Sequence, residues 1–380
     1  MPEGATSSAF TPERLRTNQG AEETVRQLLR SLLQSGQVEA VLALGKTGTE
    51  ERGVAYSLFT EPDAFAMDGD ALPLLPFMPA NGGGLLSRLT LGGALARPVA
   101  AVIRPCELRA FIELMKLNQG GLDNVVLISS TCGGVYPLGT AVNGNLDERV
   151  SSYWEGMEHG ELDEAVRPTC RACESFIPEG ADITVALFGE EDLDRQCTLY
   201  LNTERGAALA QRLEGTTVTG NSQRAAIERS KGERDAFRQK LFAGVDVGMT
   251  GLIHTFGRCI GCHGCKTVCP ICYCQLCHFD SHDCEREPGY YEGELRRKGG
   301  LRVPPDTVFF QLGRMAHMAL SCVGCGMCSD VCPADIPVST IFSKVAASAQ
   351  ATFDYEPGRD LAEEIPLRTF KEEEFAQVAT

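Results

Sequence analysis

Apolar residues recur with a helical spacing near the start of the chain. Within residues 21–35 they stand three and four positions apart, which puts them on one face of a helix. These positions are Val25, Leu28, Leu29, Leu32 and Leu33. Gly36 is typical of a helix end, and the apolar run at 38–45 predicts a strand. Residues 1–20 are polar and rich in Thr, Ser and Gly, so we expect an irregular arm there.

The clearest strand–helix–strand pattern spans residues 97–130. A short apolar run is followed by a helical pattern that begins just after Pro105, and a second β-branched run follows the Gly120–Gly121 break. Such a βαβ unit is typical of an α/β domain. Further strands are predicted at 181–189 and 197–201. No GxGxxG or GxxxxGK[ST] motif is present, so neither a Rossmann nucleotide site nor a P-loop NTPase is supported.

The second half of the chain changes character. Residues 222–242 are helical in pattern but heavily charged, with Gly232 in the middle, and predict a solvated connector. The predicted segments are an N-terminal arm and helix (1–36), an α/β domain (37–221), a helical connector (222–257), a cysteine-rich domain (258–345) and a C-terminal tail (346–380). A helix predicted at 337–350 presents an apolar face that either docks a partner subunit or packs on its own domain.

Composition narrows the functional classes. The 380 residues are 43% hydrophobic, as in an ordinary globular protein, and carry a net charge of −16, which repels nucleic acid and anionic lipid. No uncharged apolar run reaches 18 residues, so we expect no membrane span. The first residues lack the pattern of a secretory signal. The chain has 17 cysteines, clustered rather than spread as in a disulfide framework, and we expect a cytoplasmic metalloprotein.

Two cysteine runs repeat one spacing. In each run the cysteines stand three, three and four positions apart and proline follows the last, as in ferredoxins that hold two 4Fe–4S clusters. The fourth cysteine of each run ligates the other cluster in such proteins. The predicted ligands are Cys259, Cys262, Cys265 and Cys332 for cluster one, and Cys322, Cys325, Cys328 and Cys269 for cluster two. Paired zinc sites are the alternative, although zinc modules usually use a different spacing.

The two runs are separated by an insertion that contains further cysteines. These are Cys272, Cys274, Cys277 and Cys284. A fourth metal site at Cys272, Cys274 and Cys277 is one interpretation. The alternative is that these thiols pack beside the clusters, since free cysteine is commonly buried.

Four more cysteines lie in the predicted α/β domain. Cys106 follows the first strand of the βαβ unit and Cys132 follows the second, so both should emerge at the carboxyl edge of a parallel sheet. Cys170 and Cys173 form a CxxC pair. The four thiols predict a third cluster, with inert core cysteines as the alternative.

Several segments together resemble one protein family. They are RPCELRAFIELMKLNQ, SSTCGG, CRACESFIPEGADITV, CIGCHGCKTVCPICYCQLC and FDYEPGR. The chain resembles, from about residue 38 to its end, the beta subunits of coenzyme F420-reducing hydrogenases and of F420- or formate-linked dehydrogenases. The resemblance implies an α/β flavin-binding domain with an appended two-cluster ferredoxin-like domain. It also implies that Cys106, Cys132, Cys170 and Cys173 bind a 4Fe–4S cluster beside an FAD that exchanges hydride with a deazaflavin or nicotinamide.

The resemblance also directs attention to two small-residue turns. The Ser-Gly-Gly turn that approaches the flavin in the family has its nearest match at Asn81, Gly82 and Gly83, with Asn in place of Ser. A glycine run lets backbone amides approach a pyrophosphate. The family's Thr-x-x-Gly is matched by Thr203 and Gly206, which either border the flavin or form a plain strand-to-helix turn.

These observations predict an iron–sulfur flavoprotein subunit of a larger oxidoreductase of formate dehydrogenase, hydrogenase or heterodisulfide reductase type. We expect a catalytic partner subunit and a hydride carrier, either a deazaflavin or NAD. One alternative is a flavin-free 4Fe–4S relay that links the catalytic subunit to an electron-bifurcating, heterodisulfide-reductase-like partner. Another is a scaffold stabilised by zinc.

Overall fold

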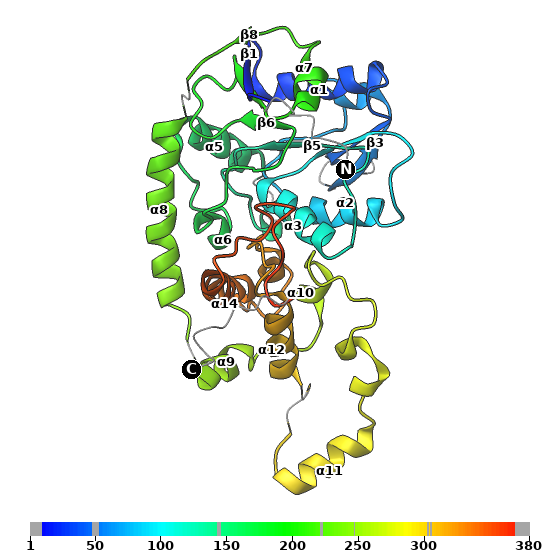
Figure 1. Ribbon diagram of the computed structural model, residues 1–380. Helices are drawn as coiled ribbons and strands as arrows, with labels where there is room; N and C mark the ends of the chain where they lie inside the picture. Colours follow the sequence, from blue (N-terminus) through cyan, green and yellow to red (C-terminus); the bar gives the residue numbers. More distant parts are fainter. Residues whose placement is uncertain are drawn as a thin grey trace, which may run out of the picture.

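The computed structural model describes residues 10–47, 53–142, 146–220, 223–246, 248–301, 304 and 306–368. Within these ranges one mixed eight-stranded sheet fills the upper half of the molecule (Figure 1). In spatial order its strands are β3 (Val54–Phe59), β2 (Ala40–Lys46), β4 (Val99–Val102), β5 (Val125–Ser130), β6 (Ile183–Ala186), β7 (Cys197–Leu201), β1 (Glu13–Thr17) and β8 (Thr216–Thr217). The predicted α/β class is confirmed.

The centre of the sheet is parallel because helical crossovers connect its strands. Strands β2, β4, β5 and β6 pair in parallel, and α3 (Pro105–Lys116) joins β4 to β5 as the βαβ pattern predicts. Alternate residues of β2 point to opposite faces. Val41 packs with α1 (Ala21–Gln34), whereas Leu42 packs with α2 (Gly82–Thr90) and α3.

The predicted irregular arm at residues 1–20 is wrong in its second half. Residues 13–17 form β1, which pairs antiparallel with β7 and with the short β8. The α/β domain therefore begins before the predicted boundary at residue 37. The segment ERLRT does not predict a strand because Leu15 is its one large apolar residue.

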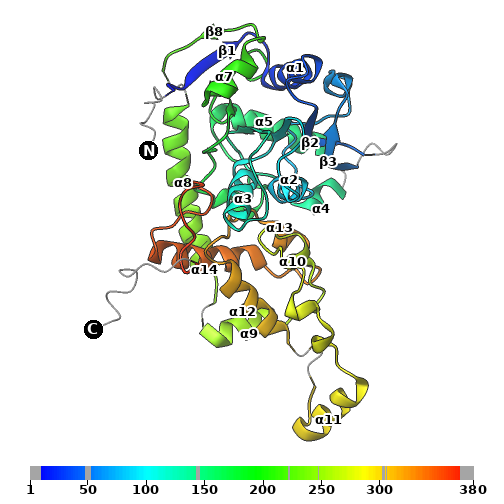
Figure 2. The ribbon, with the colours of Figure 1, turned by 45° about the vertical axis from the view of Figure 1, so that its right-hand side comes forward.

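The remaining helices of the upper half complete the α/β domain. They are η1 (Pro62–Phe65), α4 (Leu138–Val142), α5 (Leu146–His159), α6 (Pro168–Arg171) and α7 (Glu204–Ala210). The long helix α8 (Arg224–Ala243) then runs down one side of the molecule and contacts both α6 and α14 (Val338–Thr352) (Figures 1 and 2). The segment predicted as a solvated connector thus packs against both halves.

The cysteine-rich region forms the lower, helical half. Its elements are α9 (Gly248–Phe256), α10 (Gly264–Thr267), η2 (His278–Asp280), η3 (His282–Cys284), α11 (Pro288–Lys298), α12 (Thr307–Met318), α13 (Met327–Asp330) and α14. The insertion that carries α11 projects away from the body (Figures 1 and 2). Val338, Ile341 and Phe342 of α14 are buried in the core of this half, so the apolar face predicted as a partner surface packs on its own domain.

None of the helices in the described part of the chain combines the length and apolar composition that crossing a bilayer requires.

Candidate metal centres

Two of the predicted cysteines lie at the carboxyl edge of the parallel strands. Cys106 is the second residue of α3, directly beyond β4, and Cys132 follows the end of β5. Because β4 and β5 pair side by side, both thiols reach the same edge. Burial is the main cause that raises the pKa of the Cys106 thiol, and neighbouring acidic groups that include Cys132 raise it further.

The CxxC pair reaches these thiols from α6. The loop after Cys132 approaches closely because Gly134 has φ +97°, and a Cβ on it would lie 2.9 Å from Cys170 Cβ. The Gly134 N–H donates to Cys132 Sγ at 3.3 Å. Burial, with the Cys132 and Cys173 thiols, raises the pKa of Cys170 to about 12. Four cysteines from separate segments thus lie together at one edge of the sheet.

A buried arginine that the sequence did not single out lies over this group. Arg234, on α8, is 1% exposed. Its Nη1 donates to the carbonyl of Cys170 at 2.9 Å and of Cys173 at 3.4 Å, and its Nη2 donates to the carbonyl of Cys132 at 2.9 Å. Nothing in the charged pattern of residues 222–242 distinguishes this arginine from its exposed neighbours.

The second cysteine group surrounds a small cavity. A cavity of about 30 Å³ is lined by Cys269 and by the first three cysteines of the second run, Cys322, Cys325 and Cys328. Burial raises the pKa of Cys322 to about 11 and also raises that of Cys328, where Cys325 and Cys322 contribute. The last cysteine of the first run therefore joins the second run, as the ferredoxin spacing predicts.

The third group lies at the lower end. Cys259, Cys265 and Cys332 pack into the same helical core, and Cys262 is exposed. Two side chains of α12 donate toward these sulfurs. Arg314 Nη1 lies 3.0 Å from Cys265 Sγ, and Gln311 Nε2 lies 3.7 Å from the same atom. Neither residue carries a motif by which the sequence could have identified it.

The three groups follow one another in space. Cys325 is near enough to Cys106 to contribute to the raised pKa of that thiol, and Cys265 contributes in the same way to the raised pKa of Cys328. A buried ion pair joins the two halves of the molecule where the group of Cys106 approaches the group of Cys325. Arg167, the residue before α6, approaches Asp330 Oδ2 to 2.7 Å and donates to the carbonyl of Cys325 at 3.0 Å.

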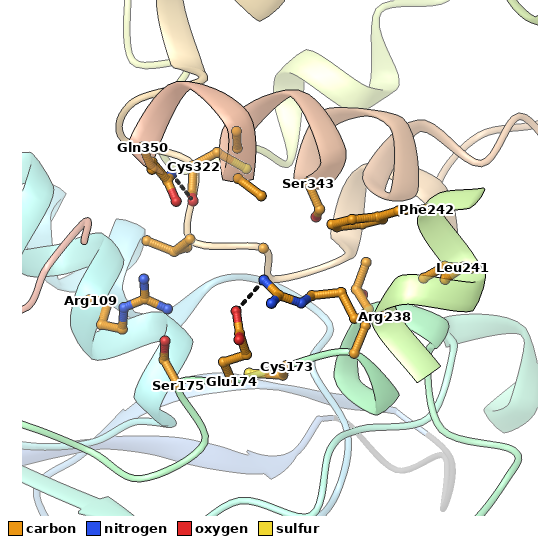
Figure 3. A pocket seen from close by; sticks show the side chains of 16 residues that line it. Arg109, Cys173, Glu174, Ser175, Arg238, Leu241, Phe242, Cys322, Ser343 and Gln350 are labelled. Atoms are coloured by element: carbon orange, nitrogen blue, oxygen red, sulfur yellow. Dashed lines mark hydrogen bonds and ion pairs between the residues drawn. The ribbon is translucent and has the colours of Figure 1, made fainter. Parts of the chain in front are cut away.

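A cleft opens beside the same junction. Figure 3 shows Cys173 of the α/β domain on one wall and Cys322 on the other, with the Arg238–Glu174 ion pair between them. This part has a volume of about 100 Å³ and adjoins a wider cavity of about 520 Å³ that shares Arg109 and Arg238. Burial is the main cause that raises the pKa of Glu174, and Arg238 opposes it.

The cysteines of the insertion do not share one environment. Cys272 packs in the helical core beside Met318, whereas Cys274 is exposed. Cys284 Sγ donates to the carbonyl of His278 at 3.2 Å. Over the described ranges, no three His, Cys, Asp or Glu side chains come close enough around one point to hold a single metal ion, either in the insertion or in the three cysteine groups. This arrangement gives no support to a fourth metal site at Cys272, Cys274 and Cys277.

Several groups of the predicted flavin turn at Asn81, Gly82 and Gly83 are bonded within the protein, whereas Asn81 Nδ2 is buried with no partner among the described residues. Asn81 Oδ1 accepts the N–H of Gly84 and caps α2. The Gly82 N–H donates to Glu107 Oε1 at 2.8 Å, and a Cβ on Gly83 would overlap the Glu107 carbonyl. The glycines therefore allow α2 to pack closely on α3.

The second predicted flavin turn lies at the opposite edge of the sheet. Thr203 caps α7 by accepting the Gly206 N–H at 3.0 Å, and its hydroxyl donates to Asp182 Oδ1 at 2.7 Å. Because β7 runs antiparallel to β6, its end lies beside the beginning of β6. Thr203 and Gly206 are thus remote from the edge that carries Cys106 and Cys132, and the plain strand-to-helix turn is what the structure contains.

Comparison with known proteins places the chain in a family. Residues 255–336 match the 4Fe–4S dicluster domain, and residues 142–220 match the C terminus of the coenzyme F420 hydrogenase/dehydrogenase beta subunit. The F420-dependent formate dehydrogenase 1 subunit beta of Methanococcus maripaludis is 30% identical over 371 residues, which are 88% of this chain and 90% of that protein. The F420-dependent formate dehydrogenase subunit beta of Methanocaldococcus jannaschii is 28% identical over 369 residues, 88% of this chain and 91% of that protein.

Among solved structures, a chain of the F420-reducing [NiFe] hydrogenase complex from Methanosarcina barkeri matches with a TM-score of 0.41 and 12% identity, covering 63% of this chain and 94% of that one. The identity and coverage of the formate dehydrogenase relatives, together with the beta-subunit match, are decisive: this chain belongs to the coenzyme F420 hydrogenase/dehydrogenase beta subunit family.

Proposed function

We propose that this chain is the electron-transfer subunit of an F420-dependent formate dehydrogenase and that it holds three 4Fe–4S clusters. The observation that carries the proposal is the series of three cysteine groups, which runs from the exposed Cys262 to Cys106 at the sheet edge. Two relatives named as beta subunits of that enzyme, each matched over about nine-tenths of its length, support the assignment. Formate oxidation itself belongs to a catalytic partner subunit.

The donor chemistry of each group suits a cubane cluster, which takes up and releases one electron at a time. The proposed ligand sets are Cys259, Cys262, Cys265 and Cys332; Cys322, Cys325, Cys328 and Cys269; and Cys106, Cys132, Cys170 and Cys173. The surrounding apolar core excludes water, and the N–H groups of Arg314 and Gln311 point at sulfur. Burial and N–H···S contacts are the means by which a protein adjusts cluster potentials.

The FAD implied by the resemblance does not fit the residues predicted for it. The amide of Gly82 is bonded to Glu107, Gly83 is packed against α3, and Thr203 and Gly206 lie at the far edge. The cavity beside Cys132 at the carboxyl edge has a volume of about 20 Å³, far below the roughly 300 Å³ of a small-molecule site. We derive no step through a flavin from these residues, and the flavin-free relay remains the second candidate function.

Anaerobic cofactor analysis of the full chain tests the proposal. Iron, acid-labile sulfide, zinc and released flavin are measured on one sample. About twelve irons and twelve sulfides per chain are expected for three cubanes. About eight irons would remove the third cluster, and zinc in place of iron would overturn the assignment. One released FAD per chain would exclude the flavin-free candidate.

Matched variants assign the third cluster. Cys173→Ser should lower the iron content by about four per chain, because one of four thiolate ligands is lost. Cys197→Ser is the control, since Cys197 is a buried core cysteine of β7 with no place in the three groups. Equal iron loss in both variants would contradict the ligand set.

A further inference from the structure

The guanidinium of Arg234 is a buried cation whose hydrogen-bond partners are all neutral. Besides the carbonyls of Cys132, Cys170 and Cys173, its Nε donates to Ser230 Oγ at 3.0 Å. Its planar group lies 4.0 Å from the ring centre of Phe176. Within the described part of the chain, no carboxylate forms an ion pair with Arg234.

Another buried arginine at the cysteine groups shows the usual arrangement. Arg167 is equally buried and also donates to a cysteine carbonyl, but the carboxylate of Asp330 lies 2.7 Å from it. That pair is neutral as a unit. Arg234 has no such partner, although an uncompensated buried charge is strongly unfavourable.

The geometry identifies what balances this charge. Arg234 bridges the backbone of three of the four cysteines proposed as ligands of the sheet-edge cluster, so it lies against that site from the α8 side. A 4Fe–4S cluster with four thiolate ligands carries a net negative charge. Arg104 and Arg167 also lie near these cysteines, but Glu107 and Asp330 pair with them. Arg234 therefore adds a fixed positive charge that no carboxylate of the described residues balances, at the place where a negative group would bind.

We propose that Arg234 is the fixed counter-cation of the cluster held by Cys106, Cys132, Cys170 and Cys173, and that it raises the reduction potential of this cluster. The inference rests on the proposed third cluster. One electron taken up by the cluster adds one negative charge to the site, so a buried cation favours the reduced form. Arg234 is a positioning residue that acts through the cluster.

A redox titration of the anaerobically purified full chain tests the inference. The signal of the sheet-edge cluster is followed by EPR during reduction with dithionite in Arg234→Gln, Arg234→Lys and wild type. Removal of the charge should lower the equilibrium constant for reduction at least tenfold, which is about 59 mV for one electron. The lysine variant keeps the charge and should stay within threefold of wild type.

Arg171→Gln is the matched control. Arg171 follows Cys170 directly on α6, but its side chain is 29% exposed and lies over the ring of Phe237. The variant removes the same charge from the same neighbourhood in a place where water screens it. Its titration should match wild type.

The outcomes separate this inference from the proposed function. Twelve irons and an unshifted potential in Arg234→Gln would overturn the role of Arg234 and leave the third cluster intact. Eight irons in wild type, with no loss in Cys173→Ser, would instead remove the third cluster itself. If the glutamine variant loses four irons, the lysine variant decides: twelve irons with a wild-type potential support the charge, whereas loss of the cluster in both variants shows a purely structural role.

Discussion

A buried carboxylate of α3, Glu113, is one of the groups that hold the C-terminal segment 353–359, beside Arg109, which donates to the Pro357 carbonyl. Tyr355→Phe removes one hydrogen bond to this carboxylate. Glu113 is fully buried, and its Oε1 accepts the Tyr355 hydroxyl at 2.5 Å and the Gly358 N–H at 2.8 Å. Lys116 Nζ lies 3.1 Å from the same oxygen. Burial, followed by the charge of Glu113, raises the pKa of Tyr355, so its hydroxyl stays protonated and donates.

The expected cost follows from the partners that remain. A hydrogen bond to a charged group contributes about 1.5–3 kcal/mol. Because the carboxylate keeps two of its three partners, we expect about 1.5 kcal/mol, near the lower end of that range. Each 1.4 kcal/mol is a factor of ten, so the segment should open about tenfold more often.

Hydrogen exchange of the full chain measures this local opening. The amides of segment 353–359, that of Gly358 above all, should exchange about tenfold faster in Tyr355→Phe than in wild type. Tyr290→Phe is the control, since Tyr290 is an exposed residue of α11. An acceleration below threefold, or an equal acceleration throughout the protein, would refute the proposed anchor.

Three further changes test the packing and the ligand sets. Asp330→Asn leaves the buried guanidinium of Arg167 without its carboxylate, which should lower the free energy of unfolding by about 3–5 kcal/mol. Limited proteolysis should then cleave between the two halves sooner than in wild type. Gly83→Ala should destabilise the protein by about 1–3 kcal/mol or more because α2 and α3 are in contact there, whereas Gly92→Ala, with open space around it, should not lower the melting temperature. Cys262→Ser should remove about four irons and Cys274→Ser none; the reverse would contradict the ligand assignment.

The parts of the fold that the sequence predicted are those with strong local patterns. The βαβ unit at residues 97–130 was recovered because β4 and β5 are buried on both faces and read as continuous apolar runs. Strand β1 was missed because Glu13–Thr17 contains one large apolar residue, Leu15, shows no alternation of buried and exposed positions, and takes its stability from pairing with β7 and β8. Pairing of distant segments leaves no periodic signal in either one.

The candidate site also combines residues that the sequence predicted with residues that it could not identify. The cysteine spacing predicted which thiols of the two runs lie together because ferredoxin-type ligand runs follow a strict local geometry. The glycine turns are ambiguous in the sequence because the absence of a side chain serves close helix packing as well as ligand approach, and at Gly83 it allows packing against α3. Arg234 and Arg314 were missed because sequence gives the charge of a residue but not which backbone it lies against.

The positions of the buried arginines have a consequence for assembly. Arg234 lies on α8, which follows in sequence the three cysteines whose carbonyls accept its hydrogen bonds. Arg167 belongs to the α/β domain but donates to the carbonyl of Cys325 in the other half. Each thiol group is thus completed by a segment remote in sequence. Burial raises the pKa of the Cys106 and Cys328 thiols, so a metal that binds there must displace their protons. Cluster binding and the packing of the two halves should therefore be coupled. A variant that separates the halves, such as Asp330→Asn, should lose iron from the two groups at the junction before it loses iron from the group that contains Cys262.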